Sequence, residues 1–174
     1  MYLQNKKQCK IGHINVNSIR YKFEPFREIL QGFILDVLTI QETNIDNSFP
    51  NNQFAVPMYR LYRQDFKNNE GGIMMYIRND MPQFGRCDIE SFSINNTNGR
   101  IEIITVEVTM SKEKWLFISV YKQPKVNLNT IIECIDNIMN QCVNSDFNVV
   151  LIGDFNVKML KKNNDFKDCW MLMV

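Results

Sequence analysis

Short apolar runs, each bounded by polar segments, recur along the chain and predict β-strands. Residues 34–40, ILDVLTI, are apolar almost throughout, which is typical of a strand covered on both faces. Residues 101–108, IEIITVEV, alternate between apolar and polar types with the period of a half-buried strand. Together the runs predict strands at residues 9–16, 34–40, 58–63, 71–78, 100–109, 114–121 and 147–152.

Two segments show the spacing of amphipathic helices. Within residues 19–32, Pro25 either ends a short first turn or begins the main helix, and Gly32 marks the C-terminal end. The apolar stripe of the second helix, residues 127–143, consists of Ile131, Ile132, Ile135, Ile138, Met139 and Cys142. The resulting order is β-α-β, a strand-rich middle with hairpins, and α-β. This order favours a layered α/β domain.

Composition adds bounds on this picture. The chain has 174 residues, 45% of them hydrophobic, and a formal net charge of +1. These values predict one globular domain over residues 1–174, and any contact with nucleic acid must come from a local basic patch. The polar N-terminus lacks a signal sequence, and no apolar run has the length of a membrane span. Five cysteines without a Cys-x-x-Cys pair favour reduced thiols in an intracellular protein.

Polar side chains follow three of the predicted strands. Asn15 and Asn17 come after the first strand, Glu42 after the second, and Asp154 with Asn156 after the last. Loops at strand ends converge above the sheet in layered α/β proteins, and ligands bind there. Carboxylate and amide oxygens suit Mg²⁺ or Mn²⁺ and a phosphate. The pattern therefore predicts a metal-dependent phosphate site.

Each of these residues also has a purely structural interpretation. Asn17 and Ser18 could cap the following helix, Glu42 could be a solvated loop acid, and Gly153-Asp154 could be an ordinary turn. Tyr121 could be a core aromatic of a buried strand. Repetition of the same residue types after three separate strands favours the functional interpretation.

Four short motifs follow one another in an informative order along the chain. They are Asn15-Val-Asn17, Gln41-Glu42-Thr43, Ser119-Val-Tyr121 and Gly153-Asp154-Phe155-Asn156. With them the chain resembles endonuclease/exonuclease/phosphatase domains, and most of all the endonuclease domain of non-LTR retrotransposons, which is similar to apurinic endonucleases. The resemblance extends from Lys10 to Asp168. It implies a four-layer α/β sandwich of two packed mixed or antiparallel sheets between helices, incomplete at the C-terminus.

The resemblance also implies roles for single residues in phosphodiester cleavage. Glu42 would be the main ligand of Mg²⁺ or Mn²⁺, with Asn17 near it. Asp154 would position the attacking water and help to deprotonate it. Tyr121 would donate a hydrogen bond to a phosphate oxygen. Asn15 and Asn156 would contact the phosphate or orient Asp154. Apart from the resemblance, Arg63, Lys122 and Lys125 lie near predicted loops, and we expect them to contact the DNA backbone.

The family pattern ends with a Ser-Asp-His segment that residues 1–174 lack. The one histidine, His13, shares a strand face with Asn15 and is expected to be a partly buried residue with a satisfied hydrogen bond. A positioned general acid or base contributes roughly 10²–10⁴ in rate, so we expect weak or no activity from this chain.

Three functions therefore stay open at this stage. The first is a Mg²⁺-dependent DNA endonuclease of a mobile element, acting in the nucleus beside a reverse transcriptase that extends the 3′-hydroxyl at the nick. The second is a phosphatase-branch enzyme for small phosphoesters such as inositol phosphates. The third is a catalytically inactive fragment that at most binds nucleic acid.

Overall fold

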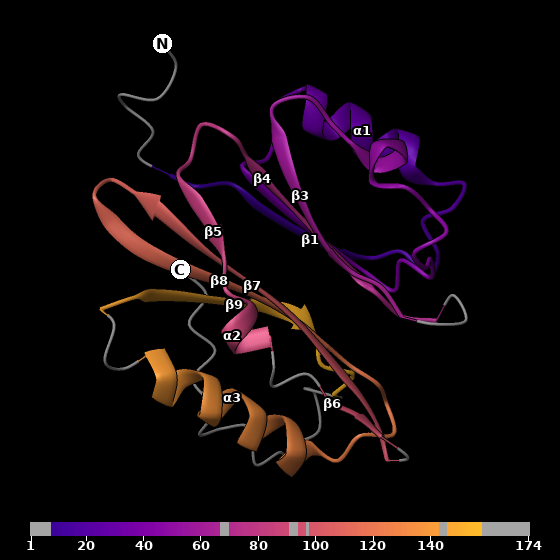
Figure 1. The fold of residues 1–174 in the computed structure, drawn as a ribbon, viewed down its shortest axis with the longest axis vertical. Coiled ribbons are helices and arrows are strands. Elements are labelled where there is room, and N and C mark those ends of the chain that lie inside the picture. The colour runs from indigo at the N-terminus through magenta and orange to yellow at the C-terminus, as the bar shows by residue number, and fades with distance from the viewer. Residues whose placement is uncertain (1–7, 67–69, 91–93, 97, 143–145, 158–174) are drawn as a thin grey trace. The chain divides into compact units, whose positions relative to one another are not determined.

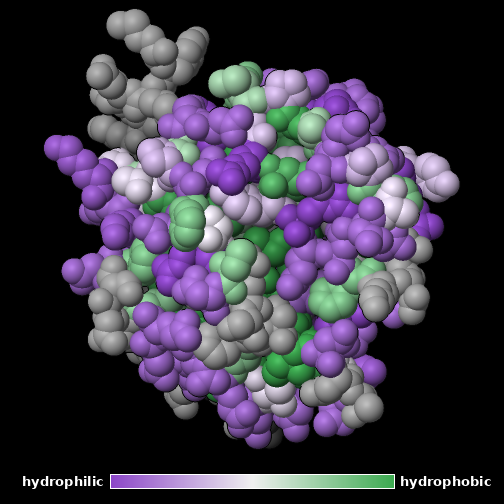
Figure 2. Space-filling model, in the orientation of Figure 1, coloured by the Kyte–Doolittle hydropathy of each residue, from purple (hydrophilic) through white to green (hydrophobic). Residues whose placement is uncertain are grey.

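The chain folds into two compact units, residues 1–82 and 83–174 (Figure 1). The computed structural model describes residues 8–66, 70–90, 94–96, 98–142 and 146–157. Each unit contains one mixed β-sheet and one longer helix that packs against it. Hydrophilic side chains make up most of the face seen in Figure 2, as the globular composition predicts. The single domain expected from the length stays a prediction.

The first unit is built around a four-stranded sheet in the order β1-β2-β4-β3. Strands β1 and β2 are parallel, and both other pairings are antiparallel. Helix α1 connects the two parallel strands, as a parallel pair requires. The elements are β1 (Ile11–Asn15), α1 (Phe23–Gln31), β2 (Val37–Gln41), the 3₁₀ helix η1 (Asn51–Phe54), β3 (Tyr59–Gln64) and β4 (Ile73–Arg78).

One face of this sheet is covered by α1. Phe23 and Leu30 of the helix share a core cluster with Leu38 and Tyr76 of the sheet. The Tyr76 hydroxyl is buried and donates a hydrogen bond of 2.8 Å to the carbonyl of Phe54, which joins η1 to the core. The alternation of side chains then places Thr39 and Gln41 on the opposite face of β2.

The second unit contains a five-stranded sheet in the order β5-β7-β8-β9, with β6 paired to β7. Strands β8 and β9 are parallel and are connected by α3, while the β7–β8 pair is an antiparallel hairpin. The elements are β5 (Gln83–Gly85), α2 (Cys87–Glu90), β6 (Ile94–Asn96), β7 (Gly99–Met110), β8 (Glu113–Lys122), α3 (Leu128–Cys142) and β9 (Asn148–Asp154).

Helix α3 covers one face of this second sheet. Its apolar stripe buries Ile131, Cys134 and Ile138 against Ile118 and Val120 of β8, among others. Burial raises the pKa of the Cys134 thiol to about 11, because the charged thiolate loses its hydration there. Of the predicted stripe, Ile131, Ile138 and Cys142 are buried and Ile132 and Ile135 are half-buried. The prediction was wrong at two positions, because Met139 is exposed and Cys134, which it left out, is buried.

The seven predicted strands and both predicted helices are present, with small shifts at their ends. Helix α1 begins at Phe23 rather than at residue 19, and Pro25 lies in its first turn. The short elements β5, α2 and β6 were not predicted. Cys9, Cys87, Cys134 and Cys142 are free thiols, and Cys169 lies outside the described residues. Over the described part of the chain, every helix is too short or too polar to cross a membrane.

Candidate active site

The first group of candidate residues lies where β1 and β2 end in the first unit. Asn15 is the last residue of β1 and pairs with Gln41, and Glu42 follows directly. Because the two strands are parallel, their carboxyl ends meet at the same edge of the sheet. Asn15 is exposed and Glu42 is half-buried, so both can reach solvent.

Backbone hydrogen bonds continue this pairing beyond the strands. The N–H of Val16 donates to the carbonyl of Gln41 at 3.0 Å, and the N–H of Ser18 donates to the carbonyl of Glu42 at 2.8 Å. The N–H of Asn17 turns back to Oδ1 of Asn15 at 3.2 Å. The position of Asn17 relative to Glu42 is therefore set by main-chain contacts, as a preorganised site requires.

The backbone around this group is strained. Asn17, Ser18, Glu42 and Asn44 have φ angles of 42°, 82°, 52° and 50°, in the left-handed region. Each such non-glycine residue costs roughly 1–2 kcal/mol. Strain of this kind gathers at active sites and ligand clamps, where surrounding contacts hold the backbone.

Asn44 supplies several of these contacts. Its Oδ1 accepts a hydrogen bond of 2.7 Å from the N–H of Gly71, and its Nδ2 donates to Oδ1 of Asn17 at 3.4 Å. Its backbone N–H donates to the carbonyl of Gly71 at 2.7 Å. Gly72 beside it has a φ of 89°, and a Cβ there would lie 2.4 Å from Oγ1 of Thr43. The glycine pair thus lets the chain pass close to the turn after β2.

His13 lies on the same strand face as Asn15, as the sequence predicted. Its Nε2 lies 2.9 Å from Oε1 of Gln41, so its hydrogen bond is satisfied. The prediction of partial burial was wrong, because His13 is exposed at the edge strand β1.

The second group lies at the ends of β8 and β9 in the second unit. Tyr121 and Asp154 are direct partners in the parallel β8–β9 ladder. Val120 and Gly153, the preceding pair, belong to the face that α3 covers, so Tyr121 and Asp154 point to the other face. Tyr121 is 5% exposed and Asp154 is half-buried. Tyr121 is buried, as its structural interpretation expected. The β8–β9 register adds that its partner on the neighbouring strand is the carboxylate of Asp154.

The turn after β9 folds back onto Asp154. The backbone N–H of Asn156 donates to Oδ1 of Asp154 at 2.9 Å, and the Asn156 side-chain amide donates to the carbonyl of Lys122 at 2.8 Å. Asn156 has a φ of 48°, which asparagine tolerates better than most residues. Asn156 therefore joins the end of β8 to the end of β9 and orients the carboxylate between them.

The fold of the chain resembles those of several solved structures. No protein-family model and no curated protein matches the sequence. The endonuclease domain of TRAS1, a telomere-specific non-LTR retrotransposon, aligns with a TM-score of 0.63 and 12% identity over 87% of this chain and 60% of its own. An endonuclease/exonuclease/phosphatase family protein from Bacteroides thetaiotaomicron aligns with a TM-score of 0.60 and 12% identity, over 88% and 64% of the two chains. The 3′ phosphatase NExo from Neisseria, bound to a product DNA hairpin, gives 0.57 and 18%, over 86% and 58%.

The chain has the endonuclease/exonuclease/phosphatase fold. The resemblance drawn from the motifs is thereby confirmed at the level of the fold, and so is the α/β class with two mixed sheets. The chain spans 60% of the length of the TRAS1 endonuclease domain. The roles of single residues within the endonuclease/exonuclease/phosphatase fold stay predictions.

The basic residues expected at the DNA backbone differ in their surroundings. Lys122 is 2% exposed, and its ammonium donates to the carbonyls of Gln123 and Val126, each at 3.1 Å. Burial lowers the pKa of Lys122, and the carboxylate of Asp154 acts in the opposite direction. A phosphate would have to replace the two carbonyls, so the nucleic-acid role of Lys122 stays a prediction.

Arg63 is occupied by a different set of partners. Its guanidinium forms an ion pair with Asp65 and donates to the carbonyls of Phe49 and Asp46 at 2.9 and 3.1 Å. It also lies over the ring of Phe54, 5.6 Å from its centre. These contacts hold the loop that follows Glu42. Arg63 therefore positions this loop, and its contact with DNA stays a prediction.

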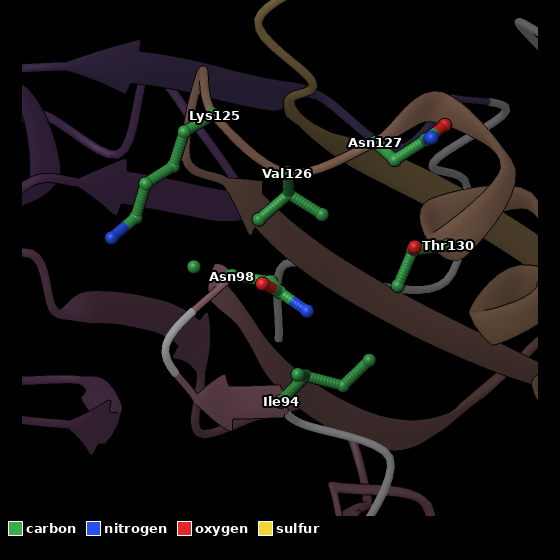
Figure 3. A pocket seen from close by; sticks show the side chains of 7 residues that line it. Ile94, Asn98, Lys125, Val126, Asn127 and Thr130 are labelled. Carbon is green, nitrogen blue, oxygen red and sulfur yellow. The ribbon is translucent and has the colours of Figure 1, made fainter.

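Lys125 is exposed and lines a cavity of about 610 Å³ between the β6–β7 turn and the loop before α3 (Figure 3). In Figure 3 its side chain extends away from Asn98 and Thr130. Gly99 packs against both Lys125 and Val126, because a Cβ there would lie 3.2 Å from Cγ of Lys125 and 2.5 Å from Cγ2 of Val126. Among the three predicted basic contacts, Lys125 is the one whose side chain is exposed.

The sequence pattern did not identify one charged residue beside the second group, Glu102. Glu102 pairs with Tyr121 across the β7–β8 hairpin, so Glu102, Tyr121 and Asp154 form a row over three strands. Glu102 is 0% exposed and forms an ion pair with Arg100. The alternating pattern of β7 assigns Glu102 to a solvent face, so periodicity alone could not find it.

Proposed function

We propose that this protein is a metal-dependent phosphodiesterase that nicks DNA, in the manner of the endonuclease domain of a non-LTR retrotransposon. The observation that carries the proposal is the placement of amide and carboxylate side chains at strand ends of both units. The fold supports it, because an endonuclease and a DNA 3′ phosphatase share that fold. Cleavage of a phosphodiester is the reaction that such side chains assist.

We propose that the first group would hold a magnesium ion. Glu42 contributes a half-buried carboxylate, and Asn17 contributes an amide oxygen that keeps a second lone pair beside its bond from Asn44. Mg²⁺ prefers oxygen ligands and keeps several of its waters, so one carboxylate and one amide are a sufficient protein donor set. Bound there, Mg²⁺ or Mn²⁺ would neutralise charge on a phosphate oxygen.

The protein's own groups would do the remaining work. Asp154, oriented by the Asn156 N–H, holds the attacking water and accepts its proton. The Tyr121 hydroxyl donates a hydrogen bond to a phosphate oxygen, and the exposed amide of Asn15 does the same. The bond from phosphorus to the 3′ oxygen breaks, and the leaving oxygen takes a proton from solvent water. The product is a nick with a 5′-phosphate and a 3′-hydroxyl, which a reverse transcriptase of the parent element could extend in the nucleus.

A second candidate acts on terminal phosphates rather than on internal phosphodiesters. The phosphatase NExo among the structural neighbours favours it, because the same fold there serves a 3′ phosphatase. The second candidate needs the same carboxylate and amide groups and differs in the leaving group. A substrate comparison therefore separates the two.

The test uses the 174-residue chain, supercoiled plasmid and Mg²⁺ or Mn²⁺, with EDTA as a blank. We expect slow nicking that is lost in EDTA and strongly lowered, but still measurable, in Glu42→Gln, while Asp154→Asn lowers the rate by about 10²-fold or more. Parallel reactions contain a 3′-phosphorylated oligonucleotide and an inositol phosphate. Phosphate release without nicking would move the assignment to the second candidate.

A double-mutant cycle tests whether both groups act on one phosphodiester. If they do, Glu42→Gln combined with Asp154→Asn costs much less than the sum of the single losses, because groups that act as a unit are not additive. Full additivity of the two losses would contradict a shared step. A folded wild-type sample that hydrolyses none of the substrates would contradict the hydrolase proposal and leave a nucleic-acid-binding role.

A further inference from the structure

Tyr21 is the most exposed large hydrophobic residue in the described part of the chain, with 98% of its surface accessible. It lies in the turn from Ile19 to Lys22, which is closed by a hydrogen bond of 3.0 Å from the N–H of Lys22 to the carbonyl of Ile19. The other described tyrosines of this unit are half-buried or buried, and Tyr59 and Tyr76 are 6% and 0% exposed. Packing therefore explains Tyr59 and Tyr76 but not Tyr21.

The residues around Tyr21 are fixed. Ile19 is 0% exposed, and its N–H donates to the carbonyl of Thr43 at 2.9 Å. Arg20 donates to the carbonyl of Asn44 at 3.1 Å, and its guanidinium lies over the ring of Phe49. The turn thus presents an exposed ring on an anchored backbone, and contact with a ligand would cost little ordering entropy.

The same turn is tied to the first group of candidate residues. The ammonium of Lys22 donates to the carbonyls of Val16 and Asn17, at 3.0 and 3.1 Å. Tyr21 therefore extends from the corner that carries Asn15 and Asn17. Two cations, Arg20 and Lys22, flank the ring in the sequence. Both cations are engaged by backbone carbonyls, and the exposed ring is the kind of platform on which an unstacked nucleobase stacks.

We propose that Tyr21 stacks on an unpaired nucleobase of the substrate strand and makes this corner a contact surface for single-stranded or locally opened nucleic acid. The inference rests on the proposed function and narrows its substrate to a polymer with accessible bases. It predicts discrimination between strands with and without bases. A contact with phosphates alone would bind strands with and without bases equally well, because every nucleotide carries the same phosphate.

A tryptophan placed at this position reports stacking directly. Tyr21→Trp is titrated in EDTA, where metal-dependent cleavage cannot occur, with a single-stranded oligonucleotide and with an abasic strand of the same length. The wild-type protein, titrated in parallel, gives the background of Trp115 and Trp170. We expect extra quenching in Tyr21→Trp with the base-containing strand and none with the abasic strand. Equal fluorescence changes with both strands would overturn the stacking contact.

Binding affinity gives a second measure with a matched control. Tyr21→Leu removes the exposed ring of the turn that follows Asn17. Phe33→Leu removes a ring of 50% exposure between α1 and β2, at the opposite end of β2 from Glu42. We expect Tyr21→Leu to weaken binding of the base-containing strand about tenfold or more. Tyr21→Phe, which keeps the ring, and Phe33→Leu should both bind this strand with the affinity of the wild type. Equal affinities of wild type and Tyr21→Leu would overturn the inference.

Failure of the inference and failure of the hydrolase proposal give different results. Plasmid nicking by the wild-type protein without base-dependent quenching would sink the Tyr21 contact alone. Base-dependent quenching without hydrolysis of any substrate would support the contact and remove the enzymatic assignment.

Discussion

Asn156 donates its backbone N–H to Oδ1 of Asp154 across 2.9 Å, while its side chain reaches back 2.8 Å to the carbonyl of Lys122. One asparagine therefore fixes a carboxylate and joins the ends of two parallel strands. Asn156 makes both contacts with its backbone in the left-handed region, at a φ of 48°.

Replacement of Asn156 should separate its conformational role from its hydrogen bond. Asn156→Ala loses the amide and keeps a Cβ in the left-handed region, so we expect a loss of about 2 kcal/mol in the free energy of unfolding. Asn156→Gly loses the amide alone and should be more stable than the alanine variant by about 1 kcal/mol. Urea denaturation of both variants measures the difference, and the reverse order would contradict the role of the turn.

Gly153 has no room for a side chain. A Cβ at this position would lie 1.9 Å from the carbonyl oxygen of Val120 and 2.9 Å from its carbon, and both atoms belong to the backbone of β8. We expect Gly153→Ala to destabilise the fold by about 3 kcal/mol or more, because the strands must move apart. Gly32→Ala is the matched control. Its φ is −73° and the nearest atom lies 3.4 Å away, so we expect a change near zero or a gain of about 0.5 kcal/mol.

Asn44 should affect metal dependence as well as stability. Asn44→Ala removes the donor to Asn17 and the acceptor for the Gly71 N–H, so the corner beside Glu42 loses its side-chain ties. We expect the Mg²⁺ concentration for half-maximal nicking to rise severalfold. Asn47→Ala, a change at an exposed residue of the same loop, should leave the Mg²⁺ dependence as in the wild type. An unchanged Mg²⁺ dependence in Asn44→Ala would contradict a positioning role.

Cys134 should make the fold sensitive to alkaline pH. Burial raises its pKa from 9.0 to about 11, so the unfolded chain releases this proton first. Stability that is present below pH ~9 is then lost as the pH rises towards ~11, by up to roughly 2–3 kcal/mol. Urea denaturation at pH 8 and 10.5 should show a smaller loss in Cys134→Ala than in the wild type. Cys87→Ala, at an exposed thiol, should keep the wild-type loss.

The elements with a strong pattern were predictable from the sequence. The alternation in residues 101–108 reappears as β7, although that strand is buried on both faces rather than on one. The amphipathic segment 127–143 reappears as α3, because burial of one face stabilises the helix. Strands β5 and β6 have three residues each, which is too short for any period to show. Their positions depend on pairing with β7, and the sequence does not encode such tertiary contacts locally.

The candidate residues were predictable as residues at strand ends, but their surroundings were not. Asn15, Glu42 and Asp154 lie at strand ends as the apolar runs indicated. Lys122 was expected near a loop at the DNA backbone, yet its ammonium is buried and donates to two carbonyls of the following loop. Glu102 and Asn44 depend on cross-strand register and on a turn conformation, which hydrophobic patterning does not reveal.

Glu42 combines its charge with a left-handed φ of 52°. β-Branched side chains tolerate that conformation poorly, whereas Gly, Asn and Asp adopt it more readily. A lineage that no longer needed the acid should therefore drift first to Asn, Asp or Gly and reach Val or Ile only after the turn itself had changed. Under the proposed function, the substitutions found at this position in related chains would then record whether catalysis or local geometry was lost first.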